Sequence, residues 1–150
     1  MSTHAEKAAE LFRKGYNCAQ ATFLAFADET SMDKKTALKL TSSFGGGMGR
    51  LREVCGAVSA IFMIAGIKYG TDDPRNDEEK ACHYALIQEL ARRFREKNGT
   101  IICRELLDLS EKHSLPIPGK RTDDYYKTRP CERFVFDAAE IMDEVIKEHK

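Results

Sequence analysis

The stretch SFGGGMGRLREVCGAVSAIFMIAGIKYG, residues 43–70, decides the fold of this chain. It joins a glycine cluster, a short basic segment, one cysteine and the most apolar run of the sequence. Ser59 is the only polar side chain between Ala57 and Ile67. This run is too short to span a bilayer, which needs about 20 apolar residues, and is typical of a helix buried on all sides. We therefore expect a central, nearly fully buried helix from Ala57 to Tyr69.

Other helical segments surround this run, and no alternating strand pattern is present. The glycines of residues 45–49 end one helix and form a loop that leads to Cys55, while Asn98-Gly99 closes the clearest helix. The sequence predicts an all-α fold, with one domain over residues 1–150 and about six helices around the central one. The predicted segments are Ala5–Arg13, Cys18–Asp28, Lys34–Ser43, Ala57–Tyr69, Asn76–Asn98, Cys103–Leu109 and Cys131–Glu148.

Composition limits the classes of function. The 150 residues suit one domain, and 24 basic residues balance 24 acidic ones without a basic stripe, so neither nucleic acid nor a membrane surface is the expected partner. The N-terminal residues lack the apolar core of a signal peptide, so we expect a cytoplasmic protein. An odd count of five cysteines in a reducing compartment argues against a disulfide framework. Buried thiols, metal ligands and redox groups remain.

Four of the five cysteines lie at or near the first turn of a predicted helix. Unpaired N–H groups and the positive end of the helix dipole lie there, so a thiolate is stabilised and its pKa falls. If the four helix starts converge, they form a pocket for several sulfurs, and hydrogen bonds to sulfur are what iron–sulfur clusters need. Cysteine is also a frequent buried residue, which is the simpler interpretation. The four are Cys18, Cys55, Cys103 and Cys131.

Cys82 differs from these four because it lies in the middle of a predicted helix. Its neighbours' N–H groups are already bonded along the helix, so no free donors face its sulfur. Cys82, Leu86 and Leu90 recur at four-residue spacing. We therefore expect Cys82 to be a neutral packing residue beside Leu86 and not a ligand.

The spacing of the cysteines leaves three hypotheses open. The first is an electron-transfer or redox-sensing protein that holds an iron–sulfur cluster. The second is a structural zinc protein that uses the same four cysteines, and the third is a thiol–disulfide redox protein. No C-x-x-C pair exists, which weighs against the second and third and favours the first. Whether the protein is an enzyme is not decided by these residues.

The cysteines and their neighbours also carry a family resemblance. The segments Tyr16–Gln20, Gly45–Gly49 and Cys55–Ala57, followed by the apolar helix and the separate Cys103 and Cys131, resemble the C_GCAxxG_C_C family of redox-active proteins. That family is similar to the iron–sulfur domain of split-Soret cytochromes. The resemblance implies a two-iron, two-sulfide cluster whose ligands are Cys18, Cys55, Cys103 and Cys131, whereas Cys82 has no counterpart in the motif.

One position departs from the family motif, because Ala60 stands where the motif has a glycine. We expect the extra methyl group to affect helix packing more than cysteine chemistry. The glycine loop itself lacks the Gly-Lys-Ser/Thr of a phosphate-binding loop. Arg50 and Arg52 are expected on the surface, with the alternative that they offset cluster charge. A redox partner protein is implied, and a homodimer is left open.

Overall fold

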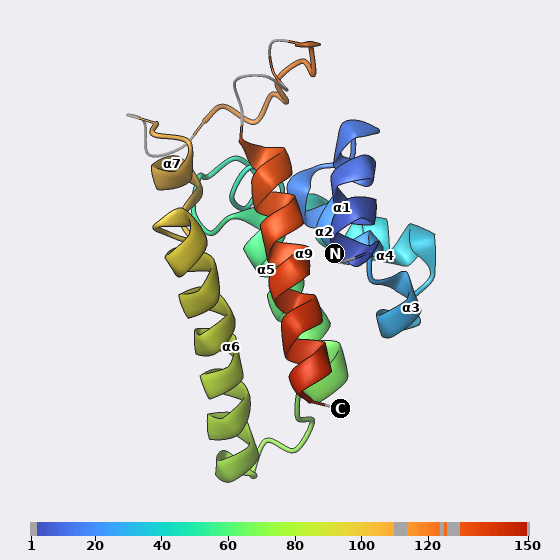
Figure 1. The fold of residues 1–150 in the computed structure, drawn as a ribbon, viewed down its shortest axis with the longest axis vertical. Helices are drawn as coiled ribbons and strands as arrows, with labels where there is room; N and C mark the ends of the chain where they lie inside the picture. Colours follow the sequence, from blue (N-terminus) through green and yellow to red (C-terminus); the bar gives the residue numbers. More distant parts are fainter. Residues whose placement is uncertain (1–2, 110–113, 124, 126–129, 150) are drawn as a thin grey trace.

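In the computed structural model, which describes residues 3–109, 114–123, 125 and 130–149, the chain folds into helices joined by loops (Figure 1). No strand occurs in these ranges apart from one isolated bridge between Val54 and Ile102, so the all-α prediction is confirmed. None of the described helices is long and apolar enough to cross a membrane. The helices are α1 (Thr3–Arg13), α2 (Cys18–Leu24), α3 (Ala27–Thr30), α4 (Lys34–Thr41), α5 (Gly56–Tyr69), α6 (Asp77–Asn98), α7 (Cys103–Leu106) and α9 (Cys131–Glu148), with a 3₁₀ turn, η1 (Ser42–Phe44), after α4.

Helix α5 is the centre of the fold, as its apolar sequence predicts. It packs against α2, α3, α6 and α9, and every residue from Gly56 to Ile61 is buried. The second half is less covered than expected, because Phe62 and Met63 are half-buried and Ile67 is 45% exposed. The buried end of α5 is therefore the end that begins at Cys55.

The predicted helix Cys18–Asp28 is two helices, α2 and α3. The chain turns at Phe26, whose φ of −103° and ψ of 27° lie outside helical geometry. This turn buries the Phe26 ring completely and stacks it on His4, with ring centroids 4.2 Å apart. His4 also lies 2.7 Å from Asp143 of α9 and 2.9 Å from Asp28, so α1 is fixed against the body at its first turn. Tertiary packing here overrides local helix propensity.

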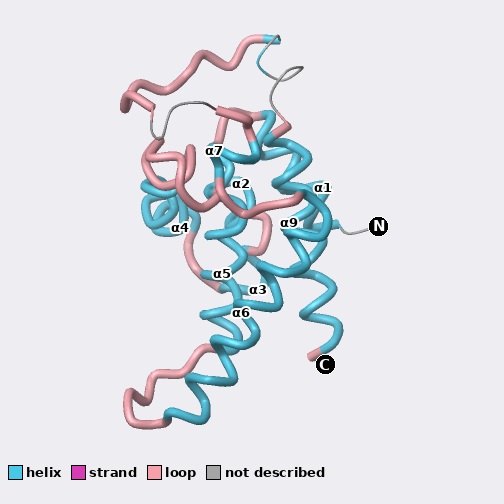
Figure 2. Tube along the Cα trace, turned by 90° about the vertical axis from the view of Figure 1, so that its left-hand side faces the viewer, coloured by secondary structure: helices cyan, strands magenta, loops and turns pink. Residues whose placement is uncertain are grey.

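Helix α6 is the longest helix, and only its second half is covered. Its buried residues are Leu90, Ala91 and Phe94. Figures 1 and 2 show the first turn of α6 and the preceding loop projecting beyond the ends of α5 and α9. Cys82 is exposed in this first half, and Leu86 is half-buried. The prediction that Cys82 packs in the core is wrong, because its side chain lies on a face of α6 that stays exposed to solvent among the described residues.

Candidate functional site

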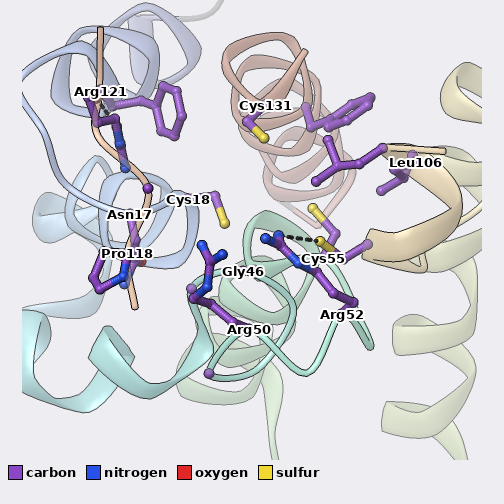
Figure 3. Close-up of a pocket in the computed structure, with 18 of the residues that line it drawn as sticks. Asn17, Cys18, Gly46, Arg50, Arg52, Cys55, Leu106, Pro118, Arg121 and Cys131 are labelled. Carbon is purple, nitrogen blue, oxygen red and sulfur yellow. Dashed lines mark hydrogen bonds between the residues drawn. The ribbon is translucent and has the colours of Figure 1, made fainter. Parts of the chain in front are cut away.

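The four cysteines at helix starts line one cavity of about 460 Å³. Cys18, Cys103 and Cys131 are the first residues of α2, α7 and α9, and Cys55 is the N-cap residue of α5. Figure 3 shows Cys18, Cys55 and Cys131 directed toward the same space from three different helices. Four residues far apart in sequence therefore line the same cavity.

All four are free thiols, and Cys82 lies outside the cavity. Within residues 3–109, 114–123, 125 and 130–149, no three His, Cys, Asp or Glu side chains are placed to hold a single metal ion. The cysteines therefore surround a space and do not meet at a point.

The start of α2 is fixed by a capping box that the sequence signals through Asn17. Asn17 Oδ1 accepts a hydrogen bond from Gln20 N at 2.8 Å, and Gln20 Oε1 accepts one from Asn17 N at 3.1 Å. Asn17 Nδ2 also donates to Ser42 O at 3.3 Å, which ties α2 to η1. These bonds hold Cys18 at the edge of the cavity.

Gly56 lets Cys18 approach the start of α5. A Cβ atom at Gly56 would lie 2.5 Å from Cys18 Sγ and 2.8 Å from Phe44 O, both closer than real contacts. Ala60, the departure from the family motif, is fully buried one turn further along α5 and does not line the cavity. Its methyl group therefore packs in the core and leaves the space between the cysteines unchanged.

A short antiparallel pairing brings Cys55 beside Cys103. Val54 and Ile102 form the isolated bridge, with Cys55 N donating to Ile101 O at 2.8 Å and Cys103 N donating to Glu53 O at 2.6 Å. Both cysteines follow directly on the bridged residues. The sequence gives no sign of this pairing, because two bridged residues make no strand pattern.

Burial decides the protonation of Cys55, which is 5% exposed. Desolvation raises the pKa of the Cys55 thiol well above its usual value, and the nearby Cys18 and Cys131 raise it further. The backbone N–H groups of Val58 and Ala57 act in the opposite direction but are outweighed. The prediction that a helix start lowers the thiol pKa is therefore wrong for Cys55 in the metal-free chain.

The glycine loop brings cationic groups to the cavity. Residues 46–50 and Arg52 all have positive φ, including the non-glycine residues Met48 at 67°, Arg50 at 66° and Arg52 at 61°. Gly47 packs so closely on α7 that a Cβ atom would lie 2.6 Å from Cys103 Cβ. The loop therefore wraps tightly against the start of α7.

Arg52 is the main residue that sequence reasoning misplaced. It is 4% exposed, not on the surface, and Nη1 donates to Cys103 Sγ at 3.6 Å (dashed in Figure 3). Its Nε donates to Ser114 Oγ at 2.8 Å. The sequence did contain a signal for this position. Arg52 lies only three residues before Cys55, so its side chain had to stay near that cysteine.

A strap formed by residues 114–121 runs along the cavity and is held at both ends. At one end Arg50 Nε donates to Leu115 O at 2.7 Å, and at the other Arg121 donates to Phe12 O at 2.7 Å and Tyr16 O at 2.8 Å. This strap belongs to the stretch Ser110–Pro130, which the sequence predicts to be a long loop of the kind that is more often functional than filler. Residues 110–113, 124 and 126–129 lie outside the described part of the chain.

The charge of the lining is one-sided. Among the described residues, three arginines and no aspartate or glutamate line the cavity. Most of the remaining surface is apolar, with Phe12, Leu106, Leu107, Tyr125 and Phe134. Four thiols, three guanidinium groups and an apolar wall suit an occupant with negative charge.

Comparison with known families agrees with this arrangement. Residues 16–145 match the family model described as "Putative redox-active protein (C_GCAxxG_C_C)". The chain belongs to the C_GCAxxG_C_C family. The match contains all four cysteines of the cavity, the glycine loop and α5. Searches of curated proteins and of solved structures found no match to this C_GCAxxG_C_C protein.

Proposed function

We propose that this redox protein binds an iron–sulfur cluster in the four-cysteine cavity and serves in electron transfer or redox sensing. The observation that carries the proposal is that four thiols from four separate helix starts line one cavity beside a buried guanidinium group. The ligands would be Cys18, Cys55, Cys103 and Cys131, and the family resemblance favours the two-iron, two-sulfide type.

The residues present fit such a group. Four cysteines are the usual ligand set of an iron–sulfur cluster, and Gly56 and Gly47 keep two close approaches free of side chains. When bound, the cluster takes up and releases an electron, and a partner protein would supply or accept it. The chain's own residues hold the sulfurs, exclude water through the apolar wall and donate an N–H group from Arg52 to Cys103.

The two alternative functions have less support. A structural zinc site requires ligands that meet tetrahedrally at one ion, and no three described side chains are placed to do so. A thiol–disulfide function requires an accessible thiolate, and Cys55 is buried with a raised pKa, so only the half-buried Cys18 and Cys131 would serve it. Zinc binding and reversible disulfide formation are therefore outcomes against which the proposal is tested.

The test is anaerobic reconstitution with ferrous iron and sulfide, followed by the visible spectrum and by iron and sulfide analysis. We expect charge-transfer absorption that bleaches on reduction, with about two irons and two sulfides per chain. Stoichiometric zinc in the protein as purified, with no iron uptake, would contradict the proposal. So would a metal-free protein whose cysteines oxidise reversibly to disulfides.

A further inference from the structure

We infer that Arg52 is a positioning residue that balances the charge of the bound cluster and raises its reduction potential. This inference rests on the proposed function. Among the residues that the structure describes, Arg52 is the only charged side chain that is buried. Its guanidinium group is directed into the space between the labelled cysteines in Figure 3 and donates to Cys103 Sγ.

Arg52 destabilises the metal-free chain in two ways. A buried ion loses hydration that an opposite charge must compensate. The Arg52 guanidinium group donates to a serine hydroxyl and a cysteine sulfur, and no described carboxylate lies within salt-bridge distance. Its φ of 61° adds backbone strain. Strained, desolvated residues of this kind persist where function requires them.

The binding of a negatively charged group would offset both the lost hydration and the backbone strain of Arg52. Two ferric ions, two sulfides and four thiolates sum to a net charge of about −2, and reduction makes this charge more negative. A cation and an N–H···S bond beside one ligand stabilise the added electron, because net charge and hydrogen bonds to the sulfurs set cluster potential. Arg50 comes from the same loop and is directed toward the same space (Figure 3), so the two guanidinium groups would offset the charge together.

The first test is the midpoint potential of reconstituted Arg52→Met and Arg52→Lys. We expect Arg52→Met to be reduced at least tenfold less favourably, which is about 59 mV lower for a one-electron couple. Arg52→Lys keeps the charge and loses the planar donor, so its potential should lie between those of Arg52→Met and the wild type. Arg92→Met is the matched control, since Arg92 lies outside the cavity and pairs with Glu89 and Glu96 on α6; its shift should be less than threefold.

The second test uses the metal-free chain, where a merely structural Arg52 would behave differently. We expect metal-free Arg52→Met to unfold at the same urea concentration as the wild type or a higher one, because methionine fills the space without a buried charge. A lower midpoint in that variant, or an unchanged potential in the loaded variants, would overturn the inference. Failure of the wild type to take up iron and sulfide would instead overturn the proposed function.

Discussion

Arginines occupy two regions of this molecule in opposite ways. Along the seam between α6 and α9, Arg93 donates to Glu89 at 2.7 Å and to Glu148 at 2.7 Å. At the cavity, Arg52 donates to a hydroxyl and a sulfur, and Arg121 donates to backbone carbonyls. The seam compensates its own charges with carboxylates from the same chain. The Arg52 guanidinium group donates only to neutral groups among the described residues.

The arginines of the seam contribute to the stability of the fold, whereas those of the cavity are available to act on a bound group. The seam charges are partly exposed pairs, and such pairs contribute about 0.2–1 kcal/mol each. The Arg93–Glu148 pair links α6 to α9 without needing a ligand. Within α6, hydrogen bonds from Arg92 and Arg93 lower the pKa of Glu89 to about 2. The cavity has an excess of positive charge and four thiols, so the stability of this end of the molecule depends on what the cavity binds.

The largest expected effect comes from removing one cavity cysteine. Cys55→Ala should lose nearly all bound iron after anaerobic reconstitution, because one iron loses its thiolate at the buried end of the cavity. Cys82→Ala is the matched control and should keep wild-type iron content. Because Cys82 is exposed, its removal should change the free energy of unfolding by less than about 0.5 kcal/mol. Equal iron loss in the two variants would show that the cavity does not select the ligands.

The second effect concerns two glycines of the same helix. Gly56→Ala places a Cβ atom against Cys18 Sγ and the Phe44 carbonyl, so we expect a loss of about 1–3 kcal/mol of stability in urea unfolding. Gly66→Ala meets nothing within 4 Å and should gain up to about 1 kcal/mol from helix propensity. Equal stability of the two variants would mean that the close approach of α2 to α5 is wrong.

Much of the helix pattern could be read from the sequence. Asn17, the Asn98-Gly99 end of α6 and the apolar run of α5 act through local chemistry, so their positions were predicted correctly. The position of the four cysteines at helix starts could be read from the sequence, but their meeting in one cavity depends on the fold, because α6 begins at the opposite end of the molecule. The exposure of Cys82 could not be read from the sequence either, since four-residue spacing cannot tell whether another helix covers that face.

The cavity details depend on contacts between distant residues. Arg52 is buried through its contacts with Ser114 and Cys103, which lie more than 50 positions away. The positive φ of Arg50 and Arg52 could not be predicted from residue type either, because left-handed backbone is expected at glycine and not at arginine. Cluster binding itself stays a prediction, because no fold property requires it.

The third effect is the pH dependence of the metal-free chain. Because burial raises the pKa of Cys55, the folded state keeps its proton above about pH 8.5, where an unfolded thiol loses it. The folded state then binds more protons, so stability falls as pH rises from 8.5, by at most about 1.4 kcal/mol per pH unit. Urea midpoints between pH 8 and 9.5 would show this slope. Cys55→Ala should flatten it, and a slope that persists in this variant would assign it to another group.

The smallest effect tests the seam. Arg93→Met should cost no more than about 1 kcal/mol at low salt, and the loss should shrink in 1 M salt because the pairs are partly exposed. Metal-free Arg52→Met should show no salt-dependent loss, since the Arg52 side chain donates to neutral groups. Urea unfolding of both variants at two salt concentrations makes the measurement. A loss of stability that depends on salt in Arg52→Met but not in Arg93→Met would show that Arg52, and not Arg93, is paired with a carboxylate.

The spread of the cavity cysteines along the chain also sets the order in which the protein can be made. Cys131 opens α9, which is synthesised after the helices that carry the other three cavity cysteines and which packs against α1, α2, α5 and α6. A site built on a C-x-x-C pair can capture metal on a partly synthesised chain, but this cavity has all its thiols only after α9 has docked. Maturation of the protein should therefore follow the synthesis and docking of α9.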